Sequence, residues 1–143
     1  MQSDATTKST ITPQEALIYA MVAAAAADRT IAELEIARMR SMVSELPAFR
    51  AVEETWFSRE AQECGKILSK PGGVDRVVRL IAQSLTGDLR ETAYALAADV
   101  AASDFAIKDD ERNFLDLLRQ GLQLDDLVCA ALQRSAQMRH RSI

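Results

Sequence analysis

Hydrophobic residues recur every three or four positions along most of the chain, which is the spacing of one face of an α-helix. Residues 74–85 are a clear example, with Val77, Val78, Ile81 and Leu85 on one side. No segment alternates apolar and polar residues as a strand does, and no glycine-rich phosphate loop occurs. The pattern predicts an all-α fold of about seven helices. The first, third and fourth span residues 13–27, 52–69 and 74–85. The second ends at 46, the fifth begins at 88, the sixth ends before 121 and the seventh begins near 125.

Local signals set the ends of several of these helices. Thr12-Pro13-Gln14-Glu15 combines a threonine N-cap, a proline in the first helical position and a glutamate three residues after the cap. Pro47 ends the second helix, and Lys70-Pro71-Gly72-Gly73 separates the third from the fourth. We predict a capping box in Asp88-Leu89-Arg90-Glu91 and a C-cap at Gly121.

Composition indicates that the helices form one domain. A chain of 143 residues can bury a substantial core, and with only 5% aromatic residues that core must consist mainly of Ala, Leu, Ile, Val and Met. We predict a disordered N-terminal tail over residues 1–11, a helical domain over 12–138 and a C-terminal tail over 139–143. The apolar run 16–27 is too short to span a bilayer, which takes about 20 residues. Acidic residues precede the run at the place where a signal peptide has basic ones. We therefore expect a cytoplasmic protein without a transmembrane segment.

Charge and cysteine content limit the partners further. A net charge of −4 disfavours nucleic acid, which requires a basic surface. The basic cluster Arg139-His140-Arg141 lies at the C-terminus, where a solvated tail is expected. Cys64 and Cys129 form no CxxC unit, so we expect each to pack as a small, reduced hydrophobic side chain.

A repeated pattern, Asp-x-x-Ile-x-x-x-Glu, is the strongest pointer to function. It occurs at Asp28 to Glu35 and again at Asp104 to Glu111, at an offset of 76 (104 − 28 = 76), each time after an alanine-rich run. The chain therefore reads as two related helical hairpins. In the structural interpretation, the aspartate stabilises the turn, the isoleucine packs in the core and the glutamate accepts a hydrogen bond from the backbone at the helix start.

A functional interpretation of the same acids is metal binding. Carboxylate oxygens suit calcium or magnesium, and Asp28 with Glu33 or Glu35 provides several of them. The second loop offers Asp104 with Asp109, Asp110 or Glu111. The loops are not EF-hands, because the acidic residues are too close together and the required glycine is missing. Zinc is disfavoured, since the single histidine lies in the C-terminal tail.

Asp99 interrupts the alanine-rich run of the fifth predicted helix. Its counterpart in the first repeat is Ala23 (99 − 76 = 23). A carboxylate there either faces solvent, which we favour, or is buried and paired, for instance with an arginine.

Three segments together resemble the TerB-like tellurite-resistance family: residues 20–29, the turn 46–50, and 90–99 followed by Asp104. The resemblance covers about residues 13–138. It implies a compact bundle of about seven helices with two related hairpins, and a divalent-cation site that maps onto Asp28, Glu35, Asp104 and Glu111. The chain departs from the family pattern at Arg29, Ala32, Phe105 and Lys108, and Lys108 places a positive charge near the second acidic pair.

The resemblance also implies a role in stress resistance, through assemblies with membrane and cytoplasmic partners. We expect a non-enzymatic stress-response module that binds unidentified protein partners, either under the control of a divalent cation or without one. The alternative is a purely structural helical adaptor whose acidic residues only cap helices. A carboxylate-based hydrolase is disfavoured, because no Ser/His/Asp set, Cys/His pair or phosphate loop is visible.

Overall fold

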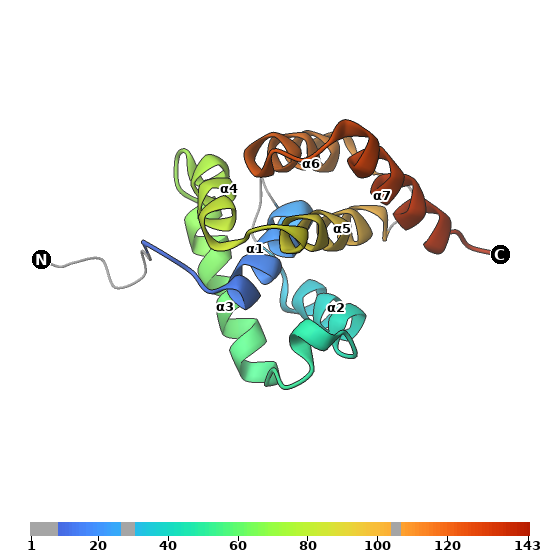
Figure 1. Cartoon of the computed structure of the whole chain (residues 1–143). Coiled ribbons are helices and arrows are strands. Elements are labelled where there is room, and N and C mark those ends of the chain that lie inside the picture. Colours follow the sequence, from blue (N-terminus) through green and yellow to red (C-terminus); the bar gives the residue numbers. More distant parts are fainter. Residues whose placement is uncertain (1–8, 27–30, 104–106) are drawn as a thin grey trace, which may run out of the picture.

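The structure, a computed structural model, describes residues 9–26, 31–103 and 107–143. The all-α prediction is confirmed: within these ranges there are helices and no strand. The helices form a compact bundle (Figure 1). Their bounds are α1 (Pro13–Ala26), α2 (Glu33–Val43), the short 3₁₀ turn η1 (Pro47–Phe49), α3 (Glu54–Leu68), α4 (Gly73–Ser84), α5 (Asp88–Ala102), α6 (Asp109–Leu122) and α7 (Asp126–Arg139).

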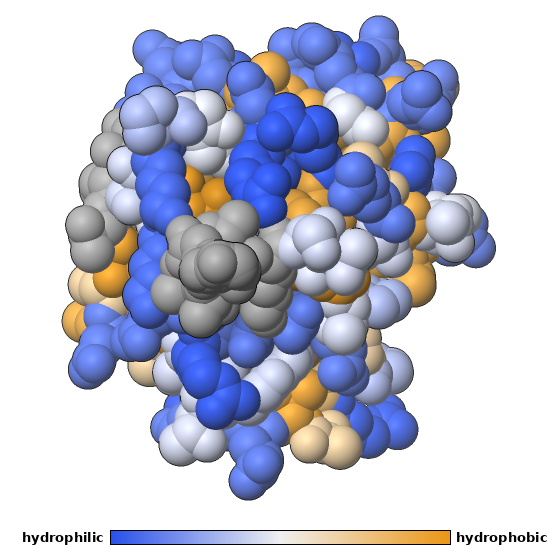
Figure 2. Space-filling model, turned by 90° about the vertical axis from the view of Figure 1, so that its left-hand side faces the viewer, coloured by the Kyte–Doolittle hydropathy of each residue, from blue (hydrophilic) through white to orange (hydrophobic). Residues whose placement is uncertain are grey.

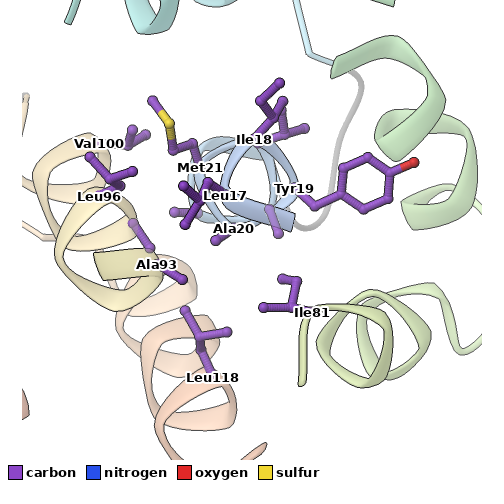
Figure 3. Packing of buried hydrophobic residues seen from close by; sticks show 14 of the residues in the cluster. Leu17, Ile18, Tyr19, Ala20, Met21, Ile81, Ala93, Leu96, Val100 and Leu118 are labelled. Carbon is purple, nitrogen blue, oxygen red and sulfur yellow. The ribbon is translucent and has the colours of Figure 1, made fainter. Parts of the chain in front are cut away.

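Helix α1 is the centre of the bundle. Every residue from Ala16 to Ala24 is buried, and α1 packs against α3, α4, α5 and α6. A helix that is apolar on all sides is stable only when it is enclosed by others. Its alanines allow neighbouring helices to approach closely. Figure 3 shows the side chains of α1 directed to several sides at once, with neighbours from three other helices: Ala93, Leu96 and Val100 of α5, Ile81 of α4 and Leu118 of α6.

The two predicted hairpins correspond to α1–α2 and α5–α6. Helices α1 and α5 end at Ala26 and Ala102, and α2 and α6 begin at Glu33 and Asp109, so both boundaries differ by 76 residues. The repeated pattern in the sequence therefore coincides with a repeated arrangement of helix boundaries. The predicted length of the second helix was wrong: α2 ends at Val43 rather than at residue 46, because the chain tightens there and the Leu46 N–H donates to the Val43 carbonyl oxygen (2.9 Å).

The helix starts agree with the sequence signals in one case and not in another. At α1, the Thr12 N–H donates to Glu15 Oε1 (2.9 Å) and the Glu15 N–H donates to Thr12 Oγ1 (3.2 Å), which confirms the capping box. The capping box predicted at Asp88 is wrong. Asp88 is already the first residue of α5, and the residue before the helix is Gly87, whose φ of 56° is easily adopted only by glycine.

Gly121 is not a C-cap, contrary to the prediction. It lies inside α6, and Gln123 with a φ of 57° ends the helix instead. A Cβ on Gly121 would lie 2.3 Å from Val78 Cγ1 of α4. The glycine is therefore required because α4 and α6 approach each other closely at this point.

Helix α7 packs on α5, and Asp99 fastens its end. The Asp99 side chain is 21% exposed, and it accepts from the guanidinium of Arg139, the last residue of α7. His140 Nε2 lies 3.7 Å from the same carboxylate oxygen. The structure lies between the two alternatives for Asp99, because the carboxylate is half-buried at the edge of the bundle and pairs there with an exposed arginine.

The two cysteines are free and buried, as expected. Figure 2 shows the side of the molecule opposite to α7, where hydrophilic residues dominate the outer surface and most of the hydrophobic residues lie in recesses between them. Among the described residues, no helix combines the length and the apolar character that crossing a membrane requires.

Candidate cation pocket between the two hairpins

Two of the four predicted metal ligands lie in the described part of the chain. Glu35 is in the first turn of α2 and Glu111 in the first turn of α6. Asp28 and Asp104, together with the family departures Arg29 and Phe105, lie outside the described residues. The geometry of the site is therefore built from the two glutamates and their surroundings.

Both glutamates cap their own helices in the same way. The Ala32 N–H donates to Glu35 Oε1 (3.1 Å), and the Lys108 N–H donates to Glu111 Oε1 (2.9 Å). These backbone groups lie at the helix starts, where they have no partner within the helix. The expectation that each glutamate accepts a bond from the N-cap backbone is confirmed in both repeats.

The isoleucines of the repeated pattern anchor these helix starts. Ile31 is 9% exposed and Ile107 is 5% exposed, and both belong to the main hydrophobic core. Each glutamate follows its isoleucine by four residues, so the buried side chain fixes the position from which the carboxylate extends. The core therefore determines where the two carboxylates lie.

The structure brings the two glutamates to one small pocket. Glu35 and Glu111 line a space of about 50 Å³ whose apolar walls include Met39, Met42 and Val100. One water molecule requires roughly 10–15 Å³ measured in this way. The pocket therefore has room for one small ion with a few waters. Residues 76 positions apart (111 − 35 = 76) thus border the same space, as an internal duplication with facing repeats would place them.

Arg38 and Lys108 line the same pocket and balance its charge. With two carboxylates and two cationic side chains, the four groups sum to zero. Over the ranges 9–26, 31–103 and 107–143, no three or more His, Cys, Asp or Glu side chains gather as a metal site. Sequence reasoning identified Lys108 but missed Arg38, although Arg38 follows Glu35 by three residues and so lies on the same face of α2.

A larger open groove of about 520 Å³ lies between α6 and α7. Tyr94 of α5 borders it and accepts a hydrogen bond from Gln133 Nε2 of α7 (2.6 Å). Cys129 also lines the groove, and burial raises the pKa of its thiol. A raised pKa keeps the thiol protonated at neutral pH, which opposes a role as a nucleophile.

Fold and pocket together define an all-α domain with two related hairpins that share one charge-balanced pocket. The chain matches the family described as "Protein of unknown function (DUF533)" over residues 2–136, and so it belongs to that family. Neither the curated proteins nor the solved structures contain a significant match to the chain.

Proposed function

We propose that the protein is a non-enzymatic, TerB-like stress-response module of the cytoplasm. It binds protein partners, and the pocket between its hairpins binds calcium or magnesium. The convergence of Glu35 and Glu111 on one pocket supports this proposal. Carboxylate oxygens are the ligands that hard cations prefer. The resemblance of the doubled Asp-x-x-Ile-x-x-x-Glu pattern to the TerB-like family supports the stress-response role.

In this proposal Asp28 and Asp104 complete the ligand set. Each precedes its glutamate by seven residues in the repeated pattern. Arg38 and Lys108 line the same pocket as the two glutamates. A divalent cation held by the carboxylates repels these two cationic side chains. Their displacement toward solvent couples cation binding to partner binding.

The second candidate is a structural helical adaptor without a metal. Each glutamate already accepts a backbone hydrogen bond, and this alone accounts for a glutamate at both positions. The two candidates differ in the role of the negative charge. Capping requires only an acceptor oxygen, whereas a cation site requires charged carboxylates.

Replacing both glutamates by glutamine separates the two candidates. Glu35→Gln with Glu111→Gln keeps the acceptor oxygens but removes the charge. We expect calcium or magnesium to bind the wild-type chain, shifting the methyl NMR signals of Met39 and Met42, and to leave the double variant unchanged. A cation at 100 times its Kd also stabilises the wild-type fold by about 2.7 kcal/mol.

The chain offers a matched control in Glu33→Gln with Asp109→Asn. These residues are also 76 positions apart (109 − 33 = 76), lie at the starts of the same helices and do not line the pocket. The control removes the same charge and should retain binding. A structural adaptor predicts a different outcome: neither ion perturbs Met39 or Met42 at millimolar concentration, and Glu35→Ala with Glu111→Ala loses stability whereas the glutamine pair does not. Capture of partners from the native host, with and without the ion, then tests the coupling.

A further inference from the structure

The outward face of α7 carries a stripe of exposed residues that combines apolar and basic side chains. We call it the α7 face; it consists of Leu127, Ala131, Arg134, Met138 and Arg141. The spacing is four, three, four and three residues, which keeps the side chains on one side of a helix. Arg141 continues the stripe just beyond the helix end at Arg139. Leu127 is 77% exposed and Met138 is 48% exposed, so the stripe presents two large apolar side chains to the outside together with its arginines.

Charge is distributed unevenly between this end of the chain and the rest. All 21 acidic residues lie at or before Asp126, and three arginines follow it. Residues 127–143 therefore carry +3, and residues 1–126 carry −7 (−4 − 3 = −7). The C-terminal part of the α7 face is the basic pole of an otherwise acidic molecule, while Asp125 and Asp126 precede its Leu127 end.

The arginines at this pole have different roles. Arg139 pairs with Asp99 and fastens α7 to α5. Arg134 and Arg141 border an open hollow of about 440 Å³ together with Gln137 and Ser142. Within the described part of the chain, neither of these two arginines has a hydrogen-bonded or ionic side-chain partner. Two unpaired guanidinium groups beside one hollow suit a phosphate group, which accepts several N–H bonds.

We propose that the α7 face docks on an anionic phospholipid surface. Arg134 and Arg141 bind lipid phosphates at the hollow, and Leu127 and Met138 insert at the boundary between headgroups and acyl chains. The combination favours a membrane over a nucleic acid, because exposed leucine and methionine side chains contribute nothing to phosphate binding along a nucleic acid backbone. Figure 1 shows α7 at the edge of the bundle, with the C-terminus directed away from the other helices, so a planar surface can reach this face.

The buried side of α7 makes the face rigid. Cys129 and Ala136 are buried, α7 packs on α5, and the Asp99–Arg139 pair holds the last turn. The backbone that carries Leu127, Arg134 and Met138 is therefore already helical before docking. The acidic remainder of the molecule is repelled by anionic lipid, which orients the protein with its basic pole toward the membrane.

Vesicle co-sedimentation of the full-length protein tests the proposal. We expect binding to phosphatidylcholine vesicles that contain phosphatidylglycerol, weaker binding at high salt, and none to pure phosphatidylcholine. Arg134→Glu with Arg141→Glu should lower the partition coefficient by about tenfold or more, since each basic residue contributes to attraction. Leu127→Ser with Met138→Ser should also weaken binding, although it leaves the charge unchanged.

Arg50→Glu with Arg79→Glu is the matched control. Both residues are exposed, and their replacement changes the net charge by the same amount at other places on the surface. The proposal is wrong if this control loses binding to the same extent as the α7 variant, or if the wild-type protein does not bind the anionic vesicles. It is also wrong if inorganic phosphate or a short RNA binds at the hollow and the vesicles do not.

Discussion

At the scale of single residues, Arg90 connects three helices by its guanidinium group alone. Its Nε donates to the Leu85 carbonyl oxygen (2.8 Å), and its two terminal nitrogens donate to the carbonyls of Leu122 (3.0 Å) and Ala82 (2.8 Å). Ala82 lies in the last turn of α4, Leu85 is the residue that directly follows that helix, and Leu122 is the last residue of α6. The last carbonyls of a helix lack partners within it, so Arg90 of α5 satisfies the ends of two neighbouring helices.

Replacing Arg90 should destabilise the fold strongly. Hydrogen bonds to charged groups contribute about 1.5–3 kcal/mol each, and carbonyls left without a partner add a further penalty. We expect Arg90→Ala to lower the free energy of unfolding by about 3 kcal/mol or more, and Arg90→Lys to restore only part of it, because lysine cannot reach three carbonyls in a plane. Urea denaturation measures both. Arg79→Ala, at an exposed arginine of α4, should stay close to wild type, and an equal loss there would contradict this account.

At the scale of elements, α4 and α6 approach each other closely at one point. Gly121 and Val78 meet there, and the space for a single methyl group is absent. Gly65 in the last turn of α3 is different, because a Cβ at that position would lie 3.8 Å from Ile31 Cγ2, an ordinary contact. The two glycines are thus a matched pair, one fixed by packing and one free to be replaced.

Alanine substitutions at the two glycines should have opposite effects. We expect Gly121→Ala to lower stability by about 2 kcal/mol, because the helices must separate or side chains must strain. Gly65→Ala should raise stability by up to about 1 kcal/mol through helix propensity. Thermal unfolding of both variants checks this. Val78→Ala combined with Gly121→Ala should be less destabilised than the sum of the single changes, and strict additivity would show that the two residues do not meet.

What the sequence could predict was local. The helix pattern, the Thr12–Glu15 capping box, the burial of Ile31 and Ile107 and the capping role of both glutamates follow from neighbours a few residues away. The roles of Gly121, Arg90 and Asp99 depend on helices that are distant in sequence. Gly121 is a residue type typical of a C-cap, but a glycine occurs at this position because the helix contacts α4 there. The meeting of Glu35 with Glu111 could be anticipated from the repeat, whereas Arg38 in the same pocket was missed.

At the scale of the whole molecule, the core contains several ionisable groups that are buried in their neutral form. Burial raises the pKa values of Tyr19, Cys64, Tyr94 and Cys129. The Tyr19 hydroxyl is fully buried and has no hydrogen-bond partner among the described residues. Figure 3 shows it on the side of α1 that faces α3. These groups make the stability of the fold sensitive to alkaline pH.

The direction of this pH dependence follows from the raised pKa values. A group whose pKa is higher in the folded state contributes its full stability below its unfolded pKa and loses it as the pH rises toward the folded value. The ordinary values are 9.0 for the cysteines and 10.0 for the tyrosines. We therefore expect these groups to cause no change of the free energy of unfolding with pH near pH 7 and a progressive fall above pH 9. Urea titrations at a series of pH values measure this.

Tyr19→Phe provides the control. It removes an ionisable group and a buried hydroxyl without a described partner, so it should be neutral or slightly stabilising at pH 7. Above pH 10, the ordinary value for tyrosine, it should lose less stability than the wild type. An unchanged slope above pH 10 would mean that Tyr19 ionises as readily in the folded protein as in the unfolded chain.

The central position of α1 also affects how the protein is made. α1 is complete at Ala26, but the helices that enclose it extend to Leu122, which is 96 residues later (122 − 26 = 96). Since a ribosome adds about 5–20 residues per second, these residues take roughly 5–20 seconds to be synthesised. During this interval α1, the most apolar of the described helices, lacks most of its packing partners. The nascent chain therefore exposes this apolar segment to solvent or to aggregation until α6 has been synthesised and can cover it.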